Sequence, residues 1–259
     1  MINDELRKIV DKIKYTDQPN PLLNEILYRL RFHRVLLFFA GLKLRKLRGK
    51  CKSFEDYLNL LASFHFSFFN RTSYVILRSM QRKSEIRKFC KILWKIRPKI
   101  VLEIGTAEGG TLFLLTRLSD PNALILSIDL SGKKKTYREV FYHSFAIDNQ
   151  KIIFLERDSH KLSTLEELKK ILRNRQIDVL FIDGDHSYEG VKKDFEMYSP
   201  LVKKNGIIGF HDIVVISPDR FPDVEVNKFW NEIKKNYEYQ ELVEDWNQEW
   251  GGIGVIKIQ

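Results

Sequence analysis

The chain has 259 residues, 44% of them hydrophobic, and a formal net charge of +10. This length and hydrophobic content are enough for one domain with a sizeable core and an additional region. Its two cysteines exclude a disulfide framework and have no metal-ligand spacing, so we expect a reducing compartment. No signal peptide or transmembrane run is visible, which predicts a soluble, cytoplasmic protein, with a location peripheral to the membrane as the alternative.

The basic excess lies at the start of the chain, where residues 1–96 hold 21 Lys/Arg against 8 Asp/Glu. Such asymmetry suggests an anionic partner, which is nucleic acid, anionic lipid or an acidic substrate. Nucleic acid is the least favoured of these, although it is not excluded. A solvated, lysine-rich helical face is the commoner cause of a charge run, so the partner stays an expectation.

The first 96 residues are expected to be helical, because they contain no alternating strand pattern. Helices are predicted over 3–14, 22–47 and 84–96. The second is basic and amphipathic, and packing on the rest of the chain or on a second copy is favoured over a membrane surface. An aromatic stretch, 53–70, is expected to line the core or a pocket. Residues 1–96 would form a lid over the site, an element that contacts the substrate, or an element that mediates oligomerisation.

From residue 97 the pattern changes to alternating strands and helices. Strands are predicted near 99–104, 124–129, 151–155, 177–182 and 206–210, with helices near 109–119, 136–147, 163–174 and 189–202. This order predicts an α/β fold with a parallel sheet. A helix near 225–236 and two more strands, near 239–243 and 252–258, predict an antiparallel return at the sheet edge.

A glycine-rich loop joins the first of these strands to its helix, in the sequence KIVLEIGTAEGGTLFLL from Lys99 to Leu115. Gly105 can adopt backbone angles closed to other residues, and Gly109 and Gly110 would let the backbone approach a ligand. The N–H groups at the helix start would face an anionic group. The loop lacks the Lys-Ser/Thr of a P-loop, and its spacing is not GxGxxG.

Acidic residues beside the loop indicate which ligand it holds. Glu103 would accept a hydrogen bond from an ammonium group, and Asp129, at the tip of the next strand, suits the two hydroxyls of a ribose. Amine, carboxylate and ribose together describe S-adenosylmethionine better than NAD. Asp158 and Ser159, after the third strand, would meet the adenine. The expected cofactor contacts are Glu103, Gly105, Thr106, Glu108, Gly109, Gly110, Thr111, Asp129, Asp158, Ser159 and Asp183.

Two further strand tips carry Asp-His pairs. The fourth strand ends in Asp183 and His186, and the fifth in His211 and Asp212. The carboxylates suit a hard cation such as Mg²⁺, and a histidine ligand would favour a softer divalent metal. The expected metal ligands are Asp183, His211 and Asp212, and His186 and His211 are the candidate catalytic residues, with His186 as general base.

These residues carry a resemblance to a known family. The segments VLEIGTAEGG, SIDL, ERDS, FIDGDHSYEGVKKD and GIIGFHD are similar, in order and spacing, to motifs of class I S-adenosylmethionine-dependent methyltransferases. The chain most resembles the branch of cephalosporin hydroxylase and the rhamnosyl and macrocin O-methyltransferases. The resemblance covers residues 97–259 and implies a Rossmann-like sheet of seven strands, helices on both faces and one antiparallel edge strand. His186 falls where catechol-type enzymes carry a catalytic lysine.

The sequence thus predicts a methyltransferase that acts, with a divalent cation, on a hydroxyl of a sugar, glycan or other polar small molecule. Three alternatives stay open: a metal-independent methyltransferase on RNA or another anionic polymer, a non-catalytic scaffold that binds membranes or partners through the basic region, and an oxidoreductase. A homo-oligomer is also compatible with the sequence.

Overall fold

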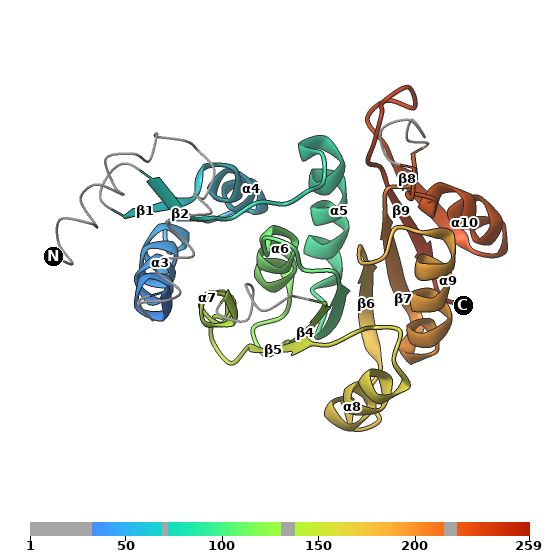
Figure 1. Cartoon of the computed structure of the whole chain (residues 1–259), viewed down its shortest axis with the longest axis horizontal. Coiled ribbons are helices and arrows are strands. Elements are labelled where there is room, and N and C mark those ends of the chain that lie inside the picture. Colours follow the sequence, from blue (N-terminus) through green and yellow to red (C-terminus); the bar gives the residue numbers. More distant parts are fainter. Residues whose placement is uncertain (1–32, 69–71, 131–137, 215–221) are drawn as a thin grey trace, which may run out of the picture.

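A computed structural model describes residues 33–68, 72–130, 138–214 and 222–259 (Figure 1). The predicted helix over 3–14 and the first part of the one over 22–47 lie outside these ranges. Within them, every helix is too short or too polar to traverse a lipid bilayer.

The N-terminal elements are three helices and a β-hairpin: α3 (His33–Arg48), α4 (Phe54–Ser63), β1 (His65–Phe68), β2 (Thr72–Ile76) and α5 (Lys83–Ile96). The predicted helix at 84–96 is confirmed as α5. The prediction that this region has no strands is wrong, because β1 and β2 pair antiparallel. Strands of four and five residues are too short to display alternation. Their aromatic and β-branched composition was the available signal.

The helix α3 packs on the rest of the chain, as its amphipathic pattern predicts. Leu37, Ala40 and Leu44 are buried in the same core cluster as residues of α6 (Gly110–Leu118) and α7 (Glu139–His143). Arg48 at its end donates hydrogen bonds to the backbone oxygen atoms of Ser144 and Phe145, at 2.7 and 3.0 Å. These contacts attach α3 to the segment that follows α7.

Seven strands form the central sheet, in the order β5-β4-β3-β6-β7-β9-β8. Their bounds are β3 (Ile100–Ile104), β4 (Leu124–Asp129), β5 (Lys151–Glu156), β6 (Ile177–Ile182), β7 (Val202–His211), β8 (Glu238–Leu242) and β9 (Ile253–Lys257). β3 to β7 pair in parallel. β9 runs antiparallel to both β7 and β8, which confirms the predicted antiparallel return at this edge.

Helices cover both faces of the sheet, and alternate strand residues enter two separate cores. α5, α6 (Gly110–Leu118) and α7 (Glu139–His143) lie on one face, while α8 (Leu162–Leu172), α9 (Tyr188–Tyr198) and α10 (Val226–Ile233) lie on the other (Figure 1). On β3, for example, Val101 belongs to the first core and Leu102 to the second. This alternation follows from the two-residue period of a strand.

Two helices end well before their predicted bounds. The helix expected over 136–147 ends at His143, as α7. The helix expected over 189–202 ends at Tyr198, and a 3-10 turn over Ser199–Leu201 leads directly into β7. Pro200 explains this second difference, because proline has no N–H to continue a helical ladder. β7 therefore starts at Val202, four residues before the predicted strand.

Candidate active site

A cavity of about 450 Å³ opens at the carboxyl ends of β3, β4, β5 and β6. Parallel strands place their carboxyl ends at one edge, where the loops that follow them meet. The cavity is lined by Ile104, Gly105, Ala107, Ile128, Asp129, Leu130, Arg157, Asp158, Ser159, His160, Asp183, Gly184, Asp185 and His186. Five of the predicted cofactor residues thus share one wall: Gly105, Asp129, Asp158, Ser159 and Asp183.

The glycines of the loop are needed for packing within the protein. Gly105 has a φ of +87°, as predicted, and a Cβ there would lie 1.9 Å from the backbone oxygen of Asp183. A Cβ at Gly110 would lie 2.0 Å from the backbone oxygen of Arg78. At Gly109, the ring of Tyr142 occupies that space. Close approach of a ligand is therefore not required to explain these three glycines.

The carboxylate of Asp129 holds the loop in place. Its Oδ2 accepts hydrogen bonds from the backbone N–H groups of Thr106 and Ala107, at 3.2 and 3.1 Å. The side chain of Thr106 is hydrogen-bonded to Ser127, one strand away. Asp129 thus fixes the loop that follows β3 and also lines the cavity.

Glu103 lies beneath the loop, and its side chain is outside the cavity wall. It is fully buried on β3, and its Oε2 accepts a hydrogen bond of 2.9 Å from the hydroxyl of Ser127. Burial raises the pKa of this carboxyl well above its usual range, and the charges of Asp183 and Asp129 act in the same direction. Its predicted contact with an ammonium group stays a prediction.

Two other predicted cofactor residues have partners outside the cavity wall. Glu108 forms an ion pair with Arg138. The hydroxyl of Thr111, in the first turn of α6, donates a hydrogen bond of 2.7 Å to the amide oxygen of Gln81. The predicted roles of Thr106, Glu108, Gly109, Gly110 and Thr111 toward the cofactor also stay predictions.

Asp183, at the tip of β6, is the centre of a polar cluster. Its Oδ2 accepts a hydrogen bond of 2.6 Å from the amide nitrogen of Gln81. Its Oδ1 lies 3.0 Å from Nδ1 of His211 and 3.7 Å from Nε2 of His186. The cluster brings together β6, β7 and the segment before α5.

Asp212 connects the two histidines from the end of β7. Its Oδ2 lies 2.8 Å from Nδ1 of His186, and its Oδ1 lies 3.4 Å from Nδ1 of His211. The backbone N–H of Gly251 donates a further hydrogen bond of 3.1 Å to Oδ1. Asp212 has a φ of +60°, a conformation that few non-glycine residues adopt and that often occurs at functional sites.

The carboxylates control the charge of both histidines. Burial alone would lower the pKa of His211, but the charges of Asp183 and Asp212 outweigh it and raise this pKa to about 9. Burial likewise acts against a raised pKa at His186, where the hydrogen bond to Asp212 and the charge of Asp183 prevail. For Asp212, the hydrogen bond from His186 and the charges of both histidines outweigh burial and lower the pKa. The cluster is thus arranged to hold positive charge.

The chemistry of the donors suits a divalent cation. Donor atoms of Asp183, His186 and His211 all lie within 4.8 Å of one another. Both ring nitrogens of His211 are buried without a hydrogen-bond partner in the described part of the chain, and Nδ1, which faces the two carboxylates, is available as a ligand atom. An imidazole beside carboxylates matches zinc, manganese or iron better than magnesium, which prefers oxygen ligands. Asp212, from the predicted set, lies against both histidines.

Three residues of the site escaped sequence reasoning. Gln81 contacts Asp183 across 102 residues of sequence, and a lone glutamine in a helical region gives no signal of such a contact. Arg157 and His160 line the cavity. Their positions directly before and after the Asp158-Ser159 pair were the available clue.

Comparison with known proteins agrees with this geometry. Residues 102–213 match the sequence model of the family described as methyltransferase domain. An uncharacterized protein of Acanthamoeba polyphaga mimivirus is 34% identical over 114 residues, which are 43% of this chain and 50% of that protein. A rhamnosyl O-methyltransferase of Mycobacterium leprae is 25% identical over 139 residues, or 51% of this chain and 56% of that one.

The chain thus spans about half the length of these two relatives. Among solved structures, the O-methyltransferase TomG from Streptomyces achromogenes, in complex with SAM, aligns with a TM-score of 0.50 and 14% identity over 66% of this chain and 80% of that one. This likeness shows the fold alone. Sheet order and cavity agree with the match of residues 102–213 to the methyltransferase-domain model, as the resemblance to class I S-adenosylmethionine-dependent methyltransferases predicts.

Proposed function

We propose that the protein transfers the methyl group of S-adenosylmethionine to a hydroxyl of a sugar, glycan or other polar small molecule, assisted by a divalent cation. The observation that carries this proposal is the cavity whose wall joins Asp129 at one strand tip to Asp183 and His186 at another. A cofactor site and a proton-accepting group thus share one space. The named activity of the Mycobacterium leprae relative supports a sugar hydroxyl as acceptor.

The cavity offers groups that suit each part of the cofactor. Asp129 would accept hydrogen bonds from the ribose hydroxyls, as acidic residues at this strand tip do in nucleotide-binding sheets. Asp158 and Ser159 would meet the adenine from the tip of β5. A volume of about 450 Å³ lies in the range of small-molecule sites. When bound, the cofactor supplies an electrophilic methyl group, and the protein holds it and excludes water.

His186 would take the proton of the acceptor hydroxyl. Asp212 engages Nδ1 of its ring at 2.8 Å, which orients the imidazole and leaves Nε2 toward Asp183 and the cavity. A base held by a carboxylate on its second nitrogen is a common arrangement in proton transfer. The neutral form of His186 would be the active one.

Asp183, His211 and Asp212 would hold the cation. Nδ1 of His211 lies within 3.4 Å of an oxygen of each carboxylate, so the three residues bring together oxygen and nitrogen donors that favour positive charge. When bound, a divalent cation supplies Lewis acidity that lowers the pKa of an acceptor hydroxyl. Asp212 would serve both parts of the site, with Oδ1 toward the cation and Oδ2 toward His186.

Thermal unfolding with S-adenosylhomocysteine tests the cofactor assignment. A ligand at about 100 times its dissociation constant stabilises the folded state by roughly 2.7 kcal/mol, a shift of several degrees. Asp129→Ala should abolish the shift, while Glu166→Ala, at an exposed position of α8, should keep it. The absence of any shift at millimolar ligand would contradict the proposal. A further shift with Mn²⁺ or Mg²⁺, removed by EDTA, would support the cation.

A further inference from the structure

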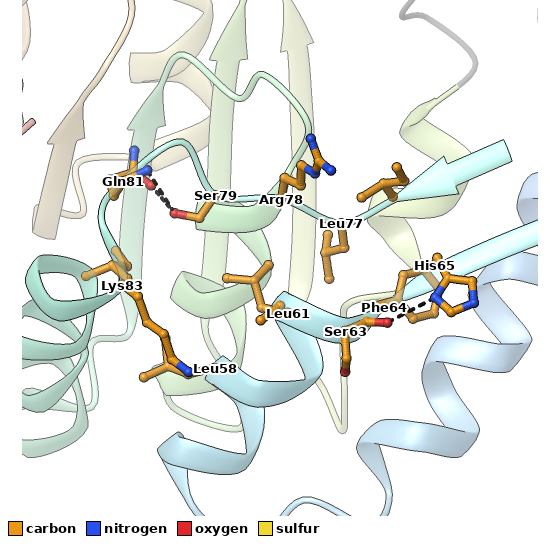
Figure 2. Close-up of a pocket in the computed structure, with 13 residues that line it drawn as sticks. Leu58, Leu61, Ser63, Phe64, His65, Leu77, Arg78, Ser79, Gln81 and Lys83 are labelled. Carbon is orange, nitrogen blue, oxygen red and sulfur yellow. Dashed lines mark hydrogen bonds between the residues drawn. The ribbon is translucent and has the colours of Figure 1, made fainter. Parts of the chain in front are cut away.

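A second cavity, of about 360 Å³, lies between α4, the β1–β2 hairpin and the start of α5 (Figure 2). It is lined by Leu58, Leu61, Ala62, Ser63, Phe64, His65, Ile76, Leu77, Arg78, Ser79, Gln81, Lys83 and Ile86. All of these residues precede the matched methyltransferase domain. The volume is large enough for a small organic group.

The wall of this N-terminal cavity combines an apolar surface with positive charge. Leu58, Leu61 and Leu77 are buried and supply aliphatic side chains. Arg78 and Lys83 lie on different sides of Leu61 in Figure 2. No acidic residue is among the described residues of the wall, and neither cation forms an ion pair within the described part of the chain. This composition suits an apolar group that carries an anionic group.

Gln81 links the N-terminal cavity to the active site. Its side chain is part of the cavity wall, yet it is only 7% exposed. Its amide nitrogen donates to Oδ2 of Asp183 at 2.6 Å, and its amide oxygen accepts from the hydroxyls of Ser79 and Thr111. Asp183 in turn lines the cofactor cavity. One side chain therefore separates the N-terminal cavity from a residue of the reaction site.

We propose that the N-terminal cavity is an acceptor subsite, which binds the part of the acceptor remote from the methylated hydroxyl. That part is an apolar group bearing an anionic group, held by the leucines and by Arg78 and Lys83. The inference rests on the proposed function in one respect, because it identifies the ligand as part of the methyl acceptor. It gives a role to Arg78 and Lys83, the two cations among the described residues of the wall.

Titration calorimetry with octyl phosphate tests the ligand class, using the full chain with and without saturating S-adenosylhomocysteine. Octyl glucoside and inorganic phosphate serve as separate probes of the apolar half and the anionic half of the ligand. Both octyl compounds are used below their critical micelle concentrations. Octyl phosphate should bind at least about tenfold more tightly than either, a difference of ~1.4 kcal/mol. Equal binding of octyl glucoside would overturn the proposal, because the cations would then play no part.

Variants locate the site. Arg78→Gln combined with Lys83→Gln should weaken octyl phosphate about tenfold or more, whereas Lys91→Gln with Lys95→Gln, which removes two exposed charges from the same helix region, should change it less than about twofold. Ala62→Trp, at an exposed wall position, should block binding by filling the cavity. Unchanged affinity in the first and third variants would exclude the N-terminal cavity.

The titrations with and without S-adenosylhomocysteine distinguish a failure of this inference from a failure of the proposed function. Octyl phosphate should bind with undiminished affinity when S-adenosylhomocysteine is present. Loss of its binding under that condition would place it in the cofactor cavity and overturn the inference. If S-adenosylhomocysteine binds and octyl phosphate does not, only the acceptor subsite fails. If octyl phosphate binds and S-adenosylhomocysteine does not, the proposed function fails, and with it the identity of the ligand as an acceptor.

Discussion

The amide nitrogen of Gln81 donates a hydrogen bond of 2.6 Å to Oδ2 of Asp183, across 102 residues of sequence. This contact orients the carboxylate, because it occupies Oδ2 and leaves Oδ1 toward His211 and His186. Groups that hold a ligand residue in this way commonly tune the affinity of the site. The segment before α5 therefore takes part in the geometry of the polar cluster around Asp183.

Gln81→Ala should weaken cation binding by roughly 10- to 100-fold, the usual effect of losing a partner of a metal ligand. Calorimetric titration with Mn²⁺ measures this change. Gln176→Ala, at an exposed position before β6, is the matched control and should bind like the wild type. Equal cation affinity in Gln81→Ala and the control would show that Asp183 does not depend on this hydrogen bond.

The periodic part of the fold was predictable from sequence. Apolar runs such as Val179 to Ile182 are buried on both faces of the sheet, and such a run indicates a buried parallel strand from local sequence alone. Because the carboxyl ends of parallel strands lie at the same edge of a sheet, Asp129, Asp158 and Asp183 were correctly expected there. Short strands without visible alternation, such as β1 and β2, carry no comparable signal.

The finer parts of the site depend on contacts between distant segments. The need for Gly105 and Gly110 comes from the backbones of Asp183 and Arg78, which lie close in space but far away in sequence. Likewise, nothing near Gln81 in the sequence indicates its partner. Sequence patterns report local periodicity, whereas these contacts are set by the packing of α5 and α6 on the sheet.

Gly110→Ala should destabilise the protein by about 3 kcal/mol, although alanine is the better helix former. The reason is that the new Cβ would lie 2.0 Å from the backbone oxygen of Arg78. Urea unfolding measures the change. Gly49→Ala, whose Cβ would meet its nearest atom at 3.6 Å, should leave stability nearly unchanged. Similar stabilities of the two variants would mean that the 78–79 segment can move away without penalty.

Glu85→Ala should lower the melting temperature by roughly 6 to 12 °C, which corresponds to about 3 kcal/mol. The buried carboxylate accepts hydrogen bonds from the side chain of Gln248 at 2.6 Å and from the backbone of Gly252 at 2.8 Å. Removing it leaves buried donors without partners. The exposed Glu166→Ala is again the control, and a shift of equal size there would reject this explanation.

The burial of Glu103 predicts a pH dependence of stability. Its folded-state pKa lies well above its unfolded value, so its favourable contribution is complete below the unfolded pKa and is lost as pH rises through the folded pKa. Glu103→Gln removes this loss. The variant should therefore gain stability relative to wild type as pH increases from about 5 to 8. Urea unfolding of the cofactor-free proteins measures the difference, and a constant difference across this range would contradict a raised pKa.

His186→Gln should abolish methyl transfer while keeping cation binding. Asp183, His211 and Asp212 keep their oxygen and nitrogen donors in this variant, whereas the proton acceptor is lost. We expect the rate of transfer to fall at least about 100-fold, as for removal of a general base.

The affinity for Mn²⁺ and the shift of the melting temperature with S-adenosylhomocysteine should equal those of the wild type. His143→Gln, an exposed histidine of α7, is the control. Loss of Mn²⁺ binding in His186→Gln would instead make His186 a cation ligand, in agreement with its nitrogen lying within 4.8 Å of the donors of Asp183 and His211, and the base would have to come from elsewhere.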